Sequence, residues 1–169
     1  MRNKLVPIIL IVAVLGFVGF MTAGCSTSDD ESTLEFYVTD VDPMAVYYEV
    51  GVSTSGAETD ISVVCKYYGD SEMAPKGLFI KRITLIAEDT SGTAITAVKD
   101  LVVYTSYFVD VAGTFTVTFA DILWPSLITW LDAQTPTGTR HMVIRIYFEG
   151  EDTAGNTLNA ITYFTVWYY

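Results

Sequence analysis

Apolar and polar residues alternate with a period of two through most of the chain after residue 33. The run from Thr114 to Phe119, for example, places three apolar residues in alternation with three threonines. Successive side chains of a β-strand point to opposite faces of a sheet, so one face of such a run can be buried while the other is in water. The pattern therefore excludes a mainly helical fold and predicts antiparallel sheets with one solvated face.

Eight runs of this kind are rich in β-branched and aromatic residues and are bounded by Gly, Asp, Ser and Thr. They cover residues 34–39, 46–52, 61–68, 79–87, 95–104, 114–119, 142–149 and 161–169. Their number and spacing predict one all-β domain over residues 34–169, an antiparallel β-sandwich of immunoglobulin-like type with about seven or eight strands. A closed barrel is the alternative.

One segment departs from the alternation and has apolar residues at helical spacing. Pro125 is compatible with the first turn of a helix there. The spaced residues are Leu123, Leu127, Trp130 and Leu131. We expect a short helix near residues 122–132 that crosses from one sheet to the other and covers the end of the core. The alternative role for this segment is a ligand-binding platform made by Trp124 and Trp130.

Two segments, 83–93 and 146–157, each run from a predicted strand into Glu-Asp-Thr, a small residue and glycine. Gly92 and Gly155 supply the positive φ of a tight turn, and the Asp side chain can accept a hydrogen bond from the backbone two residues on. The second segment resembles the hairpin between the last two strands of bacterial immunoglobulin-like and fibronectin-type-III-like domains. That resemblance implies the fold, and such domains serve mostly in binding or spacing.

The chain begins with a basic stretch, Met1–Lys4, followed by the uncharged apolar run 5–20. This is the pattern of a secretory signal. Small residues then lead to a cysteine in Thr-Ala-Gly-Cys25, which resembles the lipobox of bacterial lipoproteins. The resemblance implies a signal peptide over residues 1–24 and lipidation of Cys25, where acyl chains such as palmitate hold the protein at a membrane. Residues 25–33 are polar and acidic and are expected to be a flexible tether.

Two alternatives to the lipid anchor are an uncleaved helix over residues 5–24 and a free secreted form. Pro7 and the glycines of this segment argue against the helix. Each possibility places the rest of the chain outside the cytoplasm, in the cell envelope. Ser26 is similar to residues that allow sorting to the outer membrane in bacteria with two membranes, so we expect that location if the organism has two.

The excess of acidic side chains excludes some classes of binding partner. The full chain has 9 basic and 20 acidic side chains, and removal of the signal takes away Arg2 and Lys4, which leaves a formal charge of −13. Such a surface repels nucleic acid and anionic headgroups, so we expect no nucleic-acid partner. An envelope protein or a glycan is the expected kind of partner, besides the membrane that holds the lipid anchor.

Residues for catalysis are scarce. With Cys25 lipidated, Cys65 has no disulfide partner, and it shares a strand face with apolar residues, so we expect a buried, inert thiol. His141 is the only histidine of the chain, which allows neither a confident catalytic triad nor a zinc site, and we expect it at the surface or on a rim. We expect no cofactor and no enzyme activity, with a carboxylate-dependent hydrolase as the enzymatic alternative.

Oxygen ligands in the two repeated turns make weak calcium candidates. Asp89 and Asp152 could share an ion if their turns lie at the same end of the sandwich, with Asn156 and the neighbouring Glu88 and Glu151 as further ligands. Turn formation is the alternative role of these residues. The leading prediction of function is a membrane-tethered, non-catalytic binding or assembly module, and a spacer without a ligand is the other non-enzymatic possibility.

Overall fold

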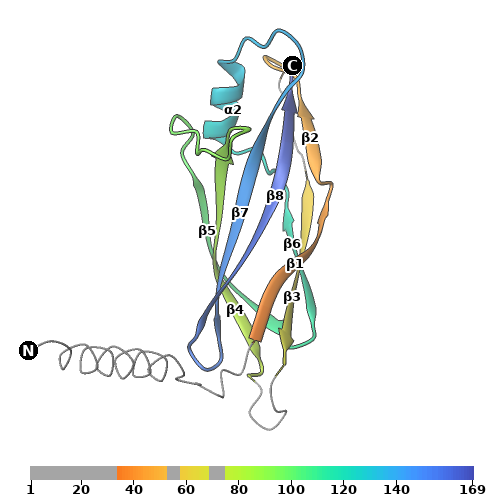
Figure 1. The fold of residues 1–169 in the computed structure, drawn as a ribbon, viewed down its shortest axis with the longest axis vertical. Helices are drawn as coiled ribbons and strands as arrows, with labels where there is room; N and C mark the ends of the chain where they lie inside the picture. Colours follow the sequence, from red (N-terminus) through yellow and green to blue (C-terminus); the bar gives the residue numbers. More distant parts are fainter. Residues whose placement is uncertain (1–33, 53–57, 69–74) are drawn as a thin grey trace, which may run out of the picture. The chain divides into compact units, whose positions relative to one another are not determined.

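The computed structural model describes residues 34–52, 58–68 and 75–169 (Figure 1). The strands are β1 (Leu34–Asp42), β2 (Ala45–Tyr48), β3 (Thr59–Tyr67), β4 (Gly77–Glu88), β5 (Leu101–Asp110), β6 (Thr114–Phe119), β7 (Arg140–Asp152) and β8 (Thr157–Tyr168). A short helix, α2 (Pro125–Asp132), lies between β6 and β7. The predicted signal, Cys25 and the rest of the predicted tether fall outside the described residues.

The strands form two sheets, one with the order β1-β3-β6 and one with the order β2-β8-β7-β4-β5. The chain changes sheet at each step from β1 to β4, stays in the five-stranded sheet through β5, and then crosses to β6 and back to β7. This is the arrangement of an immunoglobulin-like sandwich, and it confirms the predicted all-β fold.

The expectation of purely antiparallel sheets is wrong for one pair of strands. β2 runs parallel to β8, with Ala45 opposite Thr165 and Tyr48 opposite Tyr168. The two strands predicted at residues 34–39 and 46–52 belong to different sheets, with β1 beside β3 and β2 beside β8. Alternation shows which face of a strand is buried but not which neighbour the strand pairs with, so the sequence could not reveal this pairing.

The fifth predicted strand is displaced. Residues 95–104 alternate in sequence, but β5 begins at Leu101, and the chain before it forms a turn and loop. Val98 in this loop is buried, and Ile95 donates a backbone hydrogen bond to Ala87. The apolar residues of the loop are thus anchored to the core, which produces a strand-like pattern without a strand.

The core lies between the inward faces of the two sheets. β7 alternates between buried and partly exposed residues along most of its length, as its sequence predicts. Phe148 of β7 meets Phe36 of β1 edge to face, with ring centroids 6.4 Å apart, and so joins the two sheets. The outward face of the same strand carries Arg145 and Glu149, which pair with Glu88 and Arg82 of β4.

Helix α2 covers one end of this core (Figure 1). Pro125 occupies the first turn, and Leu127 and Leu131 are fully buried. The helix connects β6 of the three-stranded sheet with β7 of the five-stranded sheet. The predicted crossover helix is confirmed.

Replacing Leu127 by Ala should remove buried apolar contacts at this end and lower the free energy of unfolding by about 2–5 kcal/mol. Thr129→Ala, at an exposed position of the same helix, is the control and should have a much smaller effect. Denaturant titration of the two variants measures the difference. Equal losses would contradict the assignment of α2 as the cover of the core.

Candidate functional site

The two repeated turns lie at opposite ends of the sandwich. β4 and β7 are antiparallel, with Leu78 opposite Asp152 and Glu88 opposite Val143. Asp89 therefore follows β4 at the α2 end, while Asp152 ends β7 at the other, roughly 30 Å away by the length of the strand. The prediction of a calcium ion shared by Asp89 and Asp152 is wrong, because a repeated turn sequence does not show the direction of its strand.

The turn-forming role of these residues is confirmed. Oδ1 of Asp89 accepts the N–H groups of Ser91 and Thr93, at 2.8 and 3.0 Å. Oδ1 of Asp152 accepts those of Ala154 and Asn156, both at 2.8 Å. Gly92 and Gly155 have φ angles of +79° and +93°. Across the described ranges, no group of three or more His, Cys, Asp or Glu side chains could hold a metal ion.

Asp152 is a buried carboxylate held by its own turn. Burial works to raise its pKa, but hydrogen bonds from the side chain and N–H of Asn156 and from the N–H of Ala154 outweigh that effect and lower the pKa below its ordinary value. The Asn156 amide donates to Oδ2 at 2.9 Å. Asn156 thus serves the β7–β8 hairpin.

Asp152→Ala should lower the free energy of unfolding by about 1–3 kcal/mol at pH 7, because it removes charge-assisted hydrogen bonds from a buried turn. The lowered pKa means that the native state favours the ionised carboxylate, so its contribution is present above the unfolded pKa near 4 and is lost as the pH falls through the lower native value. The difference in the free energy of unfolding between wild type and Asp152→Ala should therefore become smaller below about pH 4. Urea titrations across pH measure it, with the exposed Asp100→Asn as a charge control, and a constant difference would contradict the explanation.

Trp124 and Trp130 do not form a joint platform, so that prediction is wrong. Trp124 is buried in the core, and its indole Nε1–H donates to the carbonyl oxygen of Lys99 at 2.7 Å. Trp130 is half-buried and packs edge to face on Tyr168, with ring centroids 6.1 Å apart. Two residues six positions apart along a helix point in directions that differ by roughly 120°, so Trp124 and Trp130 do not share a face.

A cleft of about 650 Å³ lies at the α2 end, and Trp130 contributes to it. One wall is the connection that follows β4, and the other comes from α2, the start of β7 and the end of β8. The lining residues are Asp89, Thr90, Ala94, Ile95, Thr96, Ala97, Trp130, Thr139, Arg140, His141, Met142 and Tyr168. This volume is in the range of small-molecule binding sites.

The lining combines apolar and polar groups. Met142 and Tyr168 are buried, and Ile95 and Trp130 are partly buried, so apolar side chains lie behind a cleft surface that is more polar than apolar. The exposed residues include three threonines with Arg140 and His141. A neighbouring hollow of about 250 Å³ is lined by Gln134, Thr135 and Pro136 and shares Arg140 and Tyr168 with the cleft. The two hollows therefore adjoin at Arg140.

Three contacts fix the elements around the cleft. The Trp124–Lys99 hydrogen bond ties the start of α2 to the connection before β5. At the other end of the helix, the Tyr48 hydroxyl donates to Asp132 at 2.7 Å, and the Gly51 N–H donates to the same oxygen at 3.1 Å. Burial, with the hydrogen bond to Asp132, raises the pKa of Tyr48 to about 12. The tyrosine therefore stays neutral and keeps its donated proton at physiological pH.

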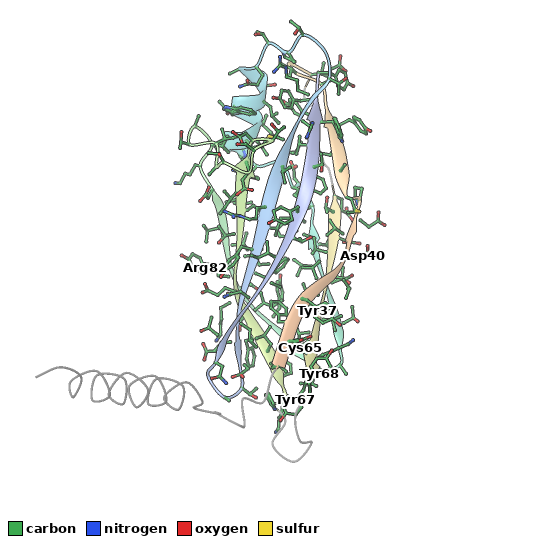
Figure 2. The ribbon with its side chains drawn as sticks, viewed as in Figure 1. Tyr37, Asp40, Cys65, Tyr67, Tyr68 and Arg82 are labelled. Carbon is green, nitrogen blue, oxygen red and sulfur yellow. The ribbon has the colours of Figure 1, made fainter. Side chains whose placement is uncertain are left out.

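His141 and Cys65 are far from each other. His141 is exposed at the cleft and packs its ring on Trp167, with centroids 4.7 Å apart, which confirms the expected position on a rim. Cys65 lies toward the opposite end and is fully buried (Figure 2). Burial raises the pKa of its thiol to about 11, with a smaller effect from the charge of Asp152. The thiol is therefore inert, as predicted.

A second surface gathers exposed aromatic and aliphatic side chains on the outer face of the five-stranded sheet. Tyr104, 79% exposed, lies opposite Arg82, and Tyr163, 55% exposed, lies opposite Arg145. Ile161 lines a shallow hollow of about 350 Å³ on this face. The strand register shows which exposed aromatic residues lie together on this face.

Comparisons with known proteins leave the family open. No protein-family model matches the chain. No curated protein matches it either. At the level of structure, it is similar to a protein described as late embryogenesis abundant, with 15% identity, a TM-score of 0.45 and coverage of 94% of this chain and 83% of the other.

Two further solved structures show weaker likeness. A structural-genomics target, SoR45, has 8% identity and a TM-score of 0.32, with coverage of 80% of this chain and 84% of the other. The periplasmic chaperone SfaE has 10% identity and a TM-score of 0.37, with coverage of 76% and 56%. At these scores the likeness bears on neither the site nor the function. Within the part of the chain that the structure describes, no helix is long and apolar enough to cross a membrane.

Proposed function

We propose that this chain is a membrane-tethered extracytoplasmic binding module without catalytic activity, and that its ligand occupies the cleft at the α2 end. The cleft is the observation that carries the proposal. It combines the partly buried Trp130 with hydroxyl and basic groups at its rim, and polar groups of this kind can orient a ligand. The lipid anchor at Cys25 rests on the sequence of residues 1–25.

The chemistry of the cleft favours binding over hydrolysis. A carboxylate-dependent hydrolase needs two acids across the scissile bond. Asp89 is the one carboxylate among the described lining residues, and its Oδ1 accepts hydrogen bonds from its own turn. His141 packs on Trp167 and shares the cleft with no cysteine or serine among the described lining residues.

The fixed walls also favour binding. The Trp124–Lys99 and Tyr48–Asp132 hydrogen bonds hold both ends of α2, and the Asp89 turn holds the opposite wall. Groups that are ordered before the ligand arrives lose little conformational entropy when it binds.

Trp130→Ala should abolish or strongly weaken ligand capture, because it removes the aromatic side of the cleft while its half-buried position limits the damage to the fold. Tyr104→Ala, on the outer sheet face, is the matched control and should bind as wild type does. The assay is affinity capture from detergent-solubilised cell envelopes together with a glycan array. If Tyr104→Ala no longer captured the ligand while Trp130→Ala still did, the binding site would be on the outer sheet face and not in the cleft. Capture of nothing by the wild type would favour the spacer, and turnover in a hydrolase screen would favour the enzyme.

Cys25→Ala should abolish incorporation of labelled palmitate, because the thiol of this cysteine is the proposed acceptor. Cys65→Ala is the control and should leave labelling intact, since Cys65 is buried in the folded domain. Gel fluorography of cells grown with labelled palmitate measures both. Continued labelling of the Cys25 variant would exclude the lipoprotein.

A further inference from the structure

Arg140 differs from the other arginines of the described residues in having no acidic partner there. Arg82 pairs with Glu149 at 2.6 Å and Arg145 pairs with Glu88 at 3.0 Å. Arg140 is exposed at the first residue of β7, where it lines both the cleft and the adjoining hollow. Its planar guanidinium can hold a carboxylate through two parallel hydrogen bonds.

The rest of the chain makes this position distinctive for an anionic ligand. Acidic side chains outnumber basic ones by 20 to 9, so most of the surface repels an anion. His141 follows Arg140 and lines the same cleft. Asp89 stands on the other wall, in the connection after β4. The cleft therefore has a basic side at the start of β7 and, across from it, the Asp89 carboxylate, whose Oδ1 is occupied by its own turn.

The remaining lining residues fit a sugar ring. A pyranose has an apolar face of C–H groups and an edge of hydroxyls, so it can pack on an aromatic ring and still make hydrogen bonds at its edge. Trp130, which is partly buried and packs on the buried ring of Tyr168, provides the aromatic surface, and Thr90, Thr96 and Thr139 add hydroxyls to the lining. A wholly apolar ligand would leave these threonines without partners, at a cost in binding free energy.

The two adjoining hollows indicate a ligand longer than one ring. The second hollow continues past Arg140 to Gln134 and Thr135, which add an amide and a hydroxyl. A chain of sugars could place one unit in the cleft and another in this hollow. Arg140 would then lie beside the junction of the two units.

We propose that the cleft binds an acidic oligosaccharide, with a carboxylate of one unit on the Arg140 guanidinium and a sugar ring packed against Trp130. This inference rests on the proposed function and names its ligand class. The oligosaccharide is at least two units long and carries its acid as a uronic-acid type of carboxylate.

Calorimetric titration of the full chain with a panel of uronic-acid trisaccharides (galacturonate, glucuronate, mannuronate and guluronate) tests the proposal. Each is paired with its methyl ester, which keeps the shape and removes the charge. At least one acid should bind, its ester should bind about tenfold or more weakly, and Arg140→Gln should weaken the acid by a similar factor. Arg140→Lys should retain part of the affinity, because it keeps the charge but loses the planar fork. Lys66→Gln removes one charge at the opposite end and should leave binding unchanged.

Failure of this inference is distinguishable from failure of the proposed function. Equal binding of acids and esters, unaffected by Arg140→Gln but lost in Trp130→Ala, would overturn the acidic ligand and leave the binding cleft in place. Binding of no panel member would also overturn the inference, and an envelope partner captured by wild type but not by Trp130→Ala would still uphold the module. If wild type bound no panel member and captured no envelope partner, both the acidic ligand and the binding module would be overturned.

Discussion

Burial of one face of the β4-β7-β8 layer against the three-stranded sheet is the constraint on which the structure depends. The inward residues of β7 are almost completely excluded from water, and Phe148 meets Phe36 across the interface. A shift of one residue in the pairing would turn these side chains outward and place Arg145 and Glu149 in the core. The alternating sequence therefore fixes the register of the central strands, and with it the positions of the turns at each end.

The two ends of the sandwich differ in how the described segments connect the strands, and the cleft lies at the α2 end. At the Asp152 end a tight, hydrogen-bonded hairpin joins β7 to β8. At the other end the chain crosses between sheets through α2, and the connection before β5 packs Val98 inward. Helix and connection leave the cleft between them, with the start of β7 on one side. The crossover that covers the core thus also creates the candidate site.

The parts of the fold that local patterns encode could be predicted from the sequence. The threonine face of β6, the first-turn proline of α2 and the Asp-Gly turns all follow from properties of neighbouring residues. The parallel β2–β8 pair could not be predicted, because it depends on which distant strand β2 meets. The loop around Val98 misled the prediction because its buried apolar residues imitate a strand.

The candidate site was less accessible to sequence reasoning than the fold. The sequence places Trp130 beside Trp124 as an alternative platform, but in the structure the ring of Trp130 packs on Tyr168 near the end of the chain, and Trp124 is bound to Lys99. Arg140 and His141 carry no motif, and they reach the cleft because β7 starts beside the connection that follows β4. Their position after the predicted helix and at the start of a strand was the one available signal. The register of antiparallel strands, which also separated Asp89 from Asp152, decides which of these residues meet.

Trp124 and Trp130 together allow the most direct test of the end cleft as the binding site. Trp130 lines the cleft and Trp124 is buried beside it, so the two indole N–H groups report on ligand contact and on the fold separately. The measurement is the ¹⁵N–¹H NMR spectrum of the labelled chain during titration with the polysaccharide fraction of cell envelopes. The Trp130 indole signal should shift progressively while that of Trp124 stays in place. An unchanged Trp130 signal, with shifts confined to the backbone amides of Tyr104 and Tyr163, would contradict the account.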